Sequence, residues 1–162
     1  MGSLKHYEFQ SAWTVEAPPE DVYDVLYEVA AYPRWWPEVK EATKLDEDRY
    51  LLRCRSFLPY DLSFVTARQR EDRVAGILEA RMEGDLEGFS RWTITAAGEG
   101  SRLVFDEVVI TNKKVLNALA PIARPAFRFN HTLMMRHGRK GLATFLAGYR
   151  LARAAERVEP RA

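Results

Sequence analysis

The sequence has little of what several common functions require. Its 162 residues contain a single cysteine, Cys54, which excludes an internal disulfide and a cysteine-rich metal site. No apolar run approaches the roughly 18 residues that a membrane-spanning helix needs, and the N-terminus lacks the apolar stretch of a signal peptide. The 24 basic and 23 acidic side chains give no net attraction toward nucleic acid or membranes. We therefore expect a cytoplasmic protein with no nucleic-acid partner and no integral membrane association.

Signatures of several enzyme classes are also absent. The chain has no HExxH zinc motif, no nucleophile elbow, no P-loop and no glycine-rich dinucleotide fingerprint after a strand. His131 and His137 are six residues apart, which places them on different faces of a helix and argues against a two-histidine metal site. We therefore expect no metal and no other cofactor.

The longest regular pattern in the chain is an amphipathic helix over Pro125–Leu151. Its apolar face is made by residues at steps of three and four, namely Phe127, Met134, Gly138, Leu142, Phe145 and Tyr149. His131 lies within this face. Gly138 and Gly141 are costly there, since each glycine in a helix loses roughly 1 kcal/mol relative to alanine. The two glycines predict that something bulky, protein or ligand, approaches the helix backbone closely.

The rest of the chain predicts strands around one early helix. An alternating strand over His6–Glu16 is followed by a helix that starts at Pro18-Pro19 and ends before Pro33. Six further strands are expected at Val39–Leu45, Tyr50–Phe57, Leu62–Arg70, Val74–Met82, Leu86–Ala96 and Leu103–Thr111. Their short connections make neighbouring strands antiparallel. A short helical lead-in over Lys113–Ala123 is expected to be interrupted by Pro121 and Pro125.

These elements predict an α+β fold. A curved seven-stranded antiparallel sheet wraps around the long C-terminal helix, and short helices lie between its first and second strands. Since each strand is apolar on one face only, that face needs a cover, and the C-terminal helix supplies it. A single helix cannot fill the concave face of such a sheet, so a cavity is expected between them.

Three segments resemble a known superfamily. They are Trp13–Tyr23 (WTVEAPPEDVY), Tyr32–Val39 (YPRWWPEV) and Pro125–His131 (PAFRFNH). In this order they resemble the START-like, Bet v 1-like (SRPBCC) superfamily, and within it the polyketide cyclase/dehydrase-like proteins. The resemblance implies a helix-grip fold with one ligand-binding domain over residues 1–152. It also implies a mostly apolar cavity under the last helix, as in lipid transport proteins and aromatase/cyclases. The arginine-rich composition of residues 153–162 predicts a frayed basic tail.

Two candidate catalytic residues stand out. His131 is placed to bond a ligand or to move a proton near neutral pH, and the alternative is a histidine tied to a backbone carbonyl or a carboxylate of the sheet. The period of two places either Asp106 or Glu107 on the apolar face, and the alternation does not decide which. A carboxylate there needs a partner, for which His131, Arg68 and Arg91 are candidates. The alternative is a cross-strand ion pair on the outer face.

The predicted ligand-binding set combines aromatic rings with small polar groups. It comprises Trp35, Trp36, Tyr50, Cys54, Ser56, Phe64, Thr66, Ser90, Trp92, Phe105, Phe127, His131 and Met134. An apolar pocket with a few placed polar groups is typical of small-molecule sites, although buried aromatic residues are more often plain core.

Two functions follow from these patterns. The first is binding of a small hydrophobic metabolite, ring-containing or acyl, between sheet and C-terminal helix. The alternative is a polyketide aromatase/cyclase or dehydratase that orients its substrate chain, with acid–base help from His131 and Glu107. The expected partner is that small hydrophobic ligand, and the protein is expected to be a monomer or homodimer.

Overall fold

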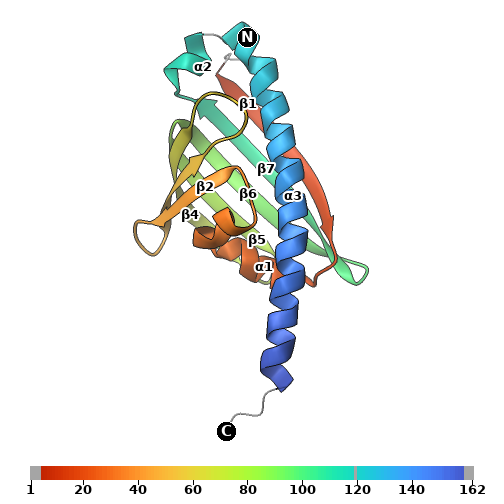
Figure 1. Ribbon diagram of the computed structural model, residues 1–162. Coiled ribbons are helices and arrows are strands. Elements are labelled where there is room, and N and C mark those ends of the chain that lie inside the picture. The colour runs from red at the N-terminus through yellow and green to blue at the C-terminus, as the bar shows by residue number, and fades with distance from the viewer. Residues whose placement is uncertain (1–4, 119, 159–162) are drawn as a thin grey trace.

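One antiparallel sheet and one long helix make up most of the molecule. The computed structural model describes residues 5–118 and 120–158. The strands are β1 (His6–Val15), β2 (Val39–Lys44), β3 (Arg49–Cys54), β4 (Leu62–Asp72), β5 (Ile77–Gly84), β6 (Leu86–Ala97) and β7 (Gly100–Thr111). The helices are α1 (Pro19–Tyr27), the 3-10 helix η1 (Val29–Arg34), α2 (Lys114–Ala118) and α3 (Ala120–Val158). The strand order β1-β7-β6-β5-β4-β3-β2 places β1 and β2 at opposite edges of the sheet (Figure 1).

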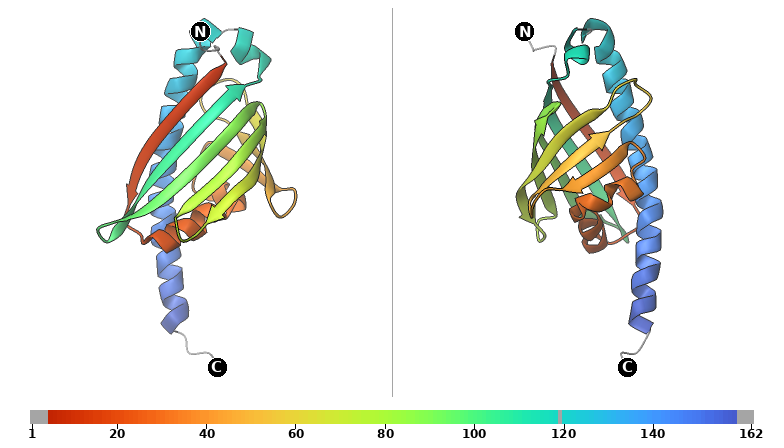
Figure 2. Two further views of the ribbon diagram at one scale, coloured as in Figure 1. Left: turned by 180° about the vertical axis from the view of Figure 1, so that it is seen from behind. Right: turned by 60° about the vertical axis from the view of Figure 1, so that its left-hand side comes forward.

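The sheet curves around α3, as the sequence predicts. Helix α3 lies across the concave face and runs on beyond the sheet (Figure 1). Seen from behind, the sheet covers the middle of α3, and α1 lies at the lower end of the strands (Figure 2). The predicted α+β helix-grip fold is therefore confirmed. None of the described helices is long and apolar enough to cross a membrane.

Strand β7 decides which acid faces the helix. Its odd-numbered residues are buried from Ser101 through Thr111, and Glu107 is among them with 6% of its surface exposed. Asp106 lies on the outer face, where its carboxylate accepts a hydrogen bond of 2.7 Å from Gln10 Nε2. The buried side chains on both sides of Glu107 therefore place its carboxylate, and not that of Asp106, toward α3.

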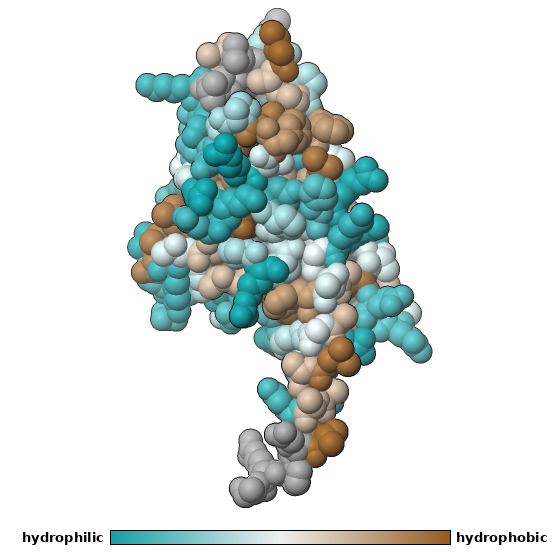
Figure 3. Space-filling view, viewed as in Figure 1, coloured by the Kyte–Doolittle hydropathy of each residue, from teal (hydrophilic) through white to brown (hydrophobic). Residues whose placement is uncertain are grey.

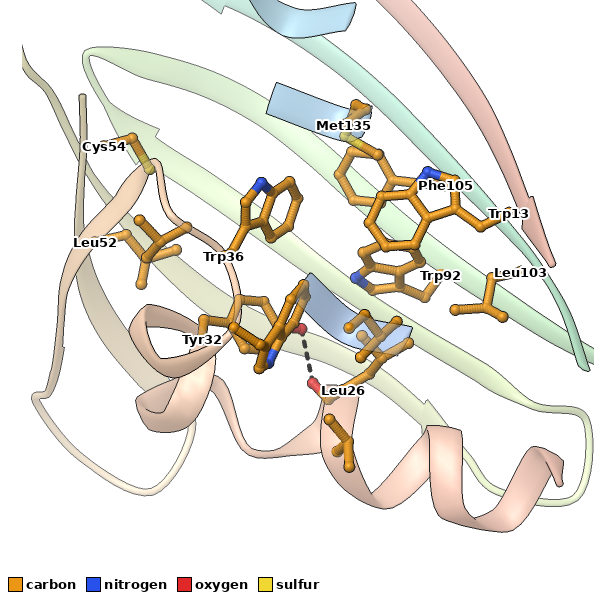
Figure 4. Close-up of a cluster of buried hydrophobic side chains, with 14 of the residues drawn as sticks. Trp13, Leu26, Tyr32, Trp36, Leu52, Cys54, Trp92, Leu103, Phe105 and Met135 are labelled. Carbon is orange, nitrogen blue, oxygen red and sulfur yellow. Dashed lines mark hydrogen bonds between the residues drawn. The ribbon is translucent and has the colours of Figure 1, made fainter. Parts of the chain in front are cut away.

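A cluster of aromatic rings fills the centre of the core. The rings of Trp13 and Trp92 meet edge to face with centroids 5.0 Å apart, and Trp92 packs on Phe105 at 4.6 Å. Trp36 reaches the same cluster from the turn between η1 and β2, with its ring centroid 6.0 Å from that of Trp13 (Figure 4). Large rings at these separations contribute to stability mainly through the apolar area that they bury.

The tryptophan turn explains the two glycines of α3. A Cβ atom added at Gly141 would lie 1.6 Å from the carbonyl oxygen of Trp35, and one added at Gly138 would lie 2.8 Å from the indole of Trp36. The indole Nε1 of Trp36 also donates a hydrogen bond of 2.9 Å to the carbonyl oxygen of Met134. The bulky group that the glycines predict is thus the turn of the protein itself.

Helix α3 begins earlier than the sequence predicts. It runs through Pro125 without a break, so the predicted interruption there is wrong. Pro125 lies in the second turn of the helix and denies a hydrogen bond only to the carbonyl of Pro121, which is exposed and can bind water instead.

Helix α3 also ends later than predicted. It continues to Val158, whereas a frayed tail is expected from residue 153. The extra turns are held by Arg153, whose guanidinium donates to the carboxylate of Asp21 on α1, a side chain of which little is exposed. Arg150 lies 3.9 Å from the other oxygen of the same carboxylate. Residues 159–162 lie outside the described residues.

The glycine contact yields a stability prediction. We expect Gly141→Ala to lower the free energy of unfolding by about 1–3 kcal/mol, because the added methyl group must push α3 away from the Trp35 carbonyl. Gly148 lies on the same helix with nothing within 4 Å of an added Cβ. Gly148→Ala should therefore raise the free energy of unfolding, by up to about 1 kcal/mol. Urea unfolding of both variants measures the two shifts, and a stabilised Gly141→Ala protein would contradict the contact.

Candidate functional site

A cavity of about 150 Å³ lies between the sheet and α3. Its walls come from the inward faces of strands β3 to β7, from the C-terminal end of α1, and from the first half of α3. Figure 4 shows Trp36 and the pair formed by Trp92 and Phe105 lying across from one another in this region. A cavity of similar volume in another protein holds one benzene molecule. The space predicted between sheet and helix is therefore present, and its size matches one six-membered ring.

Most of the predicted ligand-binding side chains line this cavity. They are Trp36, Tyr50, Cys54, Phe64, Thr66, Ser90, Trp92, Phe105, Phe127, His131 and Met134. Inward-facing alternation along the strands brings the sheet residues together, and helical spacing brings Phe127, His131 and Met134 together. Whether each of them contacts a ligand stays a prediction.

Two predicted residues are not part of the cavity wall. Trp35 is buried, but its ring packs between Tyr32, at 4.9 Å, and Trp36, at 5.3 Å, behind the ring that does line the cavity. Ser56 follows the end of β3 at Cys54, so the alternation that was expected to turn it inward has already stopped. The placement of both residues in the wall is therefore corrected.

Several wall residues were missed by sequence reasoning, and three of them matter for the contents of the cavity. Arg68 continues the inward series of β4 after Phe64 and Thr66, so the period of two could have found it. Asn130 lies three residues after Phe127 on α3, which is also a readable signal. Met135 is adjacent to the predicted Met134, and only its packing reveals that both side chains reach the cavity.

Glu107 and His131 form a buried polar pair in the wall. Glu107 Oε2 lies 3.1 Å from His131 Nε2, and both side chains line the cavity. The imidazole ring stacks on Phe9 with centroids 3.7 Å apart and planes 9° from parallel, which fixes its orientation. An unpaired carboxylate in this place would cost several kcal/mol, and the histidine removes that cost. Nε2 is the ring nitrogen that faces the carboxylate, which leaves Nδ1 as the nitrogen that does not contact Glu107.

A second buried carboxylate uses the other histidine of α3. Glu38 meets His137, whose ring is partly exposed, and this contact lies outside the cavity wall. Both carboxylates are almost fully buried, so each depends on its imidazole to avoid the cost of an isolated charge. The six-residue separation of His131 and His137 argues against a shared metal ion. It also lets each of these histidines of α3 pair with a different buried carboxylate.

The far end of the cavity carries a cation. The Arg68 side chain is only 14% exposed, and its guanidinium lies 3.8 Å from the centre of the Tyr27 ring. It donates one hydrogen bond of 2.8 Å to the carbonyl oxygen of Tyr27 and one of 3.2 Å to Glu71. A guanidinium has five N–H donors, so these contacts leave it able to bind a polar group of a ligand.

Asn130 supplies an unused acceptor. Its Nδ2 contacts Met134 Sδ at 3.5 Å, while its Oδ1 is buried and has no hydrogen-bond partner within the described part of the chain. A buried carbonyl oxygen without a partner is costly, typically by about 1–3 kcal/mol. Since Asn130 lines the cavity, a hydroxyl or amine of a ligand could satisfy this oxygen.

Two further ionisable groups of the wall are neutral at ordinary pH. Burial, with smaller effects from Glu107 and Glu38, raises the pKa of the Cys54 thiol from 9.0 to about 12. Burial also raises the pKa of Tyr32, whose hydroxyl donates a hydrogen bond of 2.7 Å to the carbonyl oxygen of Leu26. Among residues 5–118 and 120–158, no cluster of three or more metal-ligating side chains occurs. The Glu107–His131 pair is the candidate acid–base group of this cavity, because it joins an almost fully buried carboxylate to an imidazole in the wall.

Solved structures show the same fold in other proteins. A protein of Thermus thermophilus, TTHA0849, superposes with a TM-score of 0.77 at 17% identity, over 88% of this chain and 99% of that one. A START superfamily protein from Mycobacterium smegmatis gives a TM-score of 0.71 at 18% identity, over 88% and 98% of the two chains. The Zhui aromatase/cyclase from Streptomyces sp. R1128 gives 0.70 at 15% identity, over 88% and 94%. At these identities the likeness concerns the fold.

The sequence comparisons are more specific. No curated protein sequence matches the chain. A family described as polyketide cyclase / dehydrase and lipid transport matches residues 15–130, which run from the last residue of β1 through β7 and into the first third of α3. Because this match covers most of the chain, the protein belongs to the polyketide cyclase/dehydrase and lipid transport family.

Proposed function

We propose that the protein binds a small hydrophobic metabolite, ring-containing or acyl, in the cavity between its sheet and α3. The observation that supports this most directly is the cavity itself, whose mostly apolar wall includes polar groups at Glu107–His131, Asn130 and Arg68. Such a combination is typical of sites that bury a ligand and fix its orientation. The family to which the chain belongs includes lipid transport proteins, which agrees with a binding role.

The energetics require both kinds of contact. Burial of one ring removes about 150 Å² of apolar ligand surface from water and is worth about 4 kcal/mol, before the entropic cost of binding is subtracted. Apolar contact alone therefore gives weak binding. A ligand that also bonds Asn130 Oδ1 or the Arg68 guanidinium avoids this limit, so we favour a ligand with at least one hydroxyl, carbonyl or acidic group.

Binding can be tested without knowing the natural ligand. Native mass spectrometry of protein purified from its own source should show a bound small molecule that is lost on denaturation. The indoles of Trp36 and Trp92 line the cavity, so titration with one-ring probes such as phenol or acetophenone should change the intrinsic fluorescence. Protein that is empty from its own source and that fails to respond to any one-ring probe at millimolar concentration would contradict the proposal.

A substitution that fills the cavity should abolish binding. Ser90 lines the cavity from β6, and Ser90→Leu replaces its hydroxyl by three carbon atoms in that space. We expect the affinity for a one-ring probe to fall at least tenfold, while the free energy of unfolding changes by less than about 1.5 kcal/mol. Ser63 lies on β4 with its side chain exposed, so Ser63→Leu is the matched control and should leave affinity unchanged. Equal affinities in both variants would place the ligand elsewhere.

The lone thiol reports on the same cavity. Because the pKa of Cys54 is about 12 instead of 9.0, its thiolate fraction at pH 8 should be about a thousandfold smaller than that of an ordinary cysteine. We expect a correspondingly slow reaction with a disulfide reagent, and fast reaction of Ser63→Cys in a Cys54→Ser background. The folded protein holds the proton more tightly than the unfolded chain, so the contribution of Cys54 to stability is complete below pH 9 and is lost as pH rises toward 12. Fast labelling of native Cys54 at pH 8 would contradict this environment.

The Glu107–His131 pair favours a second candidate, an enzyme of the cyclase or dehydratase type. A cyclase of this kind holds a flexible poly-β-keto or hydroxy chain, and a proton moves between the reacting carbon or oxygen and the imidazole. The 3.1 Å contact, the stacking on Phe9 and the access to the cavity give His131 the geometry of a positioned acid–base group. A chain of several ketide units exceeds about 150 Å³, however, and the cavity would have to widen to hold it. For this reason binding is our first choice.

Proton exchange separates the two candidates. If His131 and Glu107 move protons, the protein in D2O should speed deuterium exchange at the methyl carbon next to the carbonyl of acetophenone, measured by NMR. His131→Gln and Glu107→Gln should each reduce this exchange at least a hundredfold, with the affinity for acetophenone changed less than about threefold. If acetophenone binds and its exchange is not accelerated, the Glu107–His131 pair has only a structural role, and the cyclase or dehydratase hypothesis is excluded.

A further inference from the structure

A second hollow lies on the outside of the molecule, between the edge strand β1 and α3. It has a volume of about 550 Å³ and includes four consecutive residues of β1, from Gln10 to Trp13. Side chains of consecutive strand residues point to opposite faces, so a wall made by all four must be the edge of the strand, where the backbone is accessible. On the opposite side lies the segment of α3 that contains Arg136, Arg139 and Lys140.

The hydrogen bonds of β1 tell which backbone groups face this groove. Thr111 N donates to the carbonyl of Lys5 across the β1–β7 ladder, so odd-numbered residues of β1 direct their backbone groups toward β7. The even-numbered residues then point away from the sheet. Two contacts with α3 agree, since Arg124 donates 3.1 Å to the carbonyl of His6 and Arg150 donates 2.9 Å to the carbonyl of Glu16.

Between those two arginine contacts the strand edge is unused. The outward N–H and C=O groups of Gln10 and Ala12 have no hydrogen-bond partner in the part of the chain that the structure describes. β1 is also the last strand of the sheet on this side. An edge of this kind is a template for one more strand.

The length of the groove fits a short extended chain. Its wall on β1 is four residues long and spans about 13 Å, and its wall on α3, from Thr132 to Lys140, runs about 12 Å at 1.5 Å per residue. The hollow, of about 550 Å³, is open to solvent, so a segment can enter it from the side.

The charge of the groove selects the occupant. Arg136, Arg139 and Lys140 are exposed and make no ion pair with any described residue. None of the nearby acids pairs with these cations, because Glu38 contacts His137, Asp106 accepts a hydrogen bond from Gln10, and Glu8 lies 3.7 Å from His6. A second copy of the chain would bring the same three cations together, whereas an acidic segment would neutralise them.

We infer that this groove binds an extended acidic segment of a partner protein, which pairs with β1 as an additional strand and places its carboxylates against Arg136, Arg139 and Lys140. The backbone of Gln10 and Ala12 supplies the pairing, and the three cations supply the selectivity. The inference does not rest on the proposed function, because the strand edge and the three cations lie outside the cavity wall.

A seven-residue peptide of alternating glutamate and valine, blocked at both ends, is a direct probe. Titrated into isotope-labelled full-length protein, it should shift the amide NMR signals of Gln10 and Ala12 and slow their exchange with solvent at least tenfold. The same peptide with every second backbone nitrogen methylated keeps its charges but cannot pair, and should bind at least tenfold more weakly. Equal binding of the two peptides, or no binding at 2 mM, would overturn the inference.

Two charge variants complete the test. The double variant Arg136→Glu/Arg139→Glu should weaken the peptide at least tenfold, while Arg157→Glu, an exposed cation farther along α3, should change affinity less than twofold. An equal loss of peptide affinity in both variants would mean that only the overall charge matters, and would overturn the inference. A dimeric mass in light scattering with the amides of Gln10 and Ala12 already protected would overturn it too, because a second copy would then occupy the groove.

Discussion

The contact of the Trp35–Trp36 turn with α3 is the constraint on which the rest of the structure depends. A backbone carbonyl meets the helix backbone at Gly141, an indole lies against Gly138, and the same indole is hydrogen-bonded to the Met134 carbonyl. These contacts set the height of the helix above the sheet. Because Trp36 is also a wall of the cavity, the interaction that holds α3 in place determines the width of the space beneath it. In Figure 3 teal and white residues cover the middle of the molecule, and brown residues lie near the two ends of α3.

The architecture and most of the residues that line the cavity could be predicted from the sequence. Alternation in the strands and the steps of three and four in the last helix depend only on local geometry, and they correctly brought Phe64, Trp92 and His131 to one space. Alternation could not choose between Asp106 and Glu107, because both neighbouring series are apolar and only the pairing with β1 fixes the face. It also failed at Ser56, where the strand ends before the pattern does.

Other features depend on packing that no local pattern encodes. Which of Trp35 and Trp36 reaches the cavity is set by how the turn rests on the glycines of α3. The volume of the cavity is the space between the sheet and α3 minus the volume of the side chains that enter this space. It therefore cannot be predicted from the composition alone. The continuation of α3 to Val158 likewise depends on Arg153 finding Asp21 on a distant helix.

Helix α3 is a wall common to two compartments. One side of it presents His131 and Met134 to the interior, and the other presents Arg136 and Arg139 to solvent beside β1. If α3 moves as a rigid body relative to the sheet, both the cavity and the groove beside β1 change shape. Any displacement of α3 that enlarges the inner space must also alter the spacing between its cations and the strand edge, so occupancy of either compartment is mechanically linked to the shape of the other.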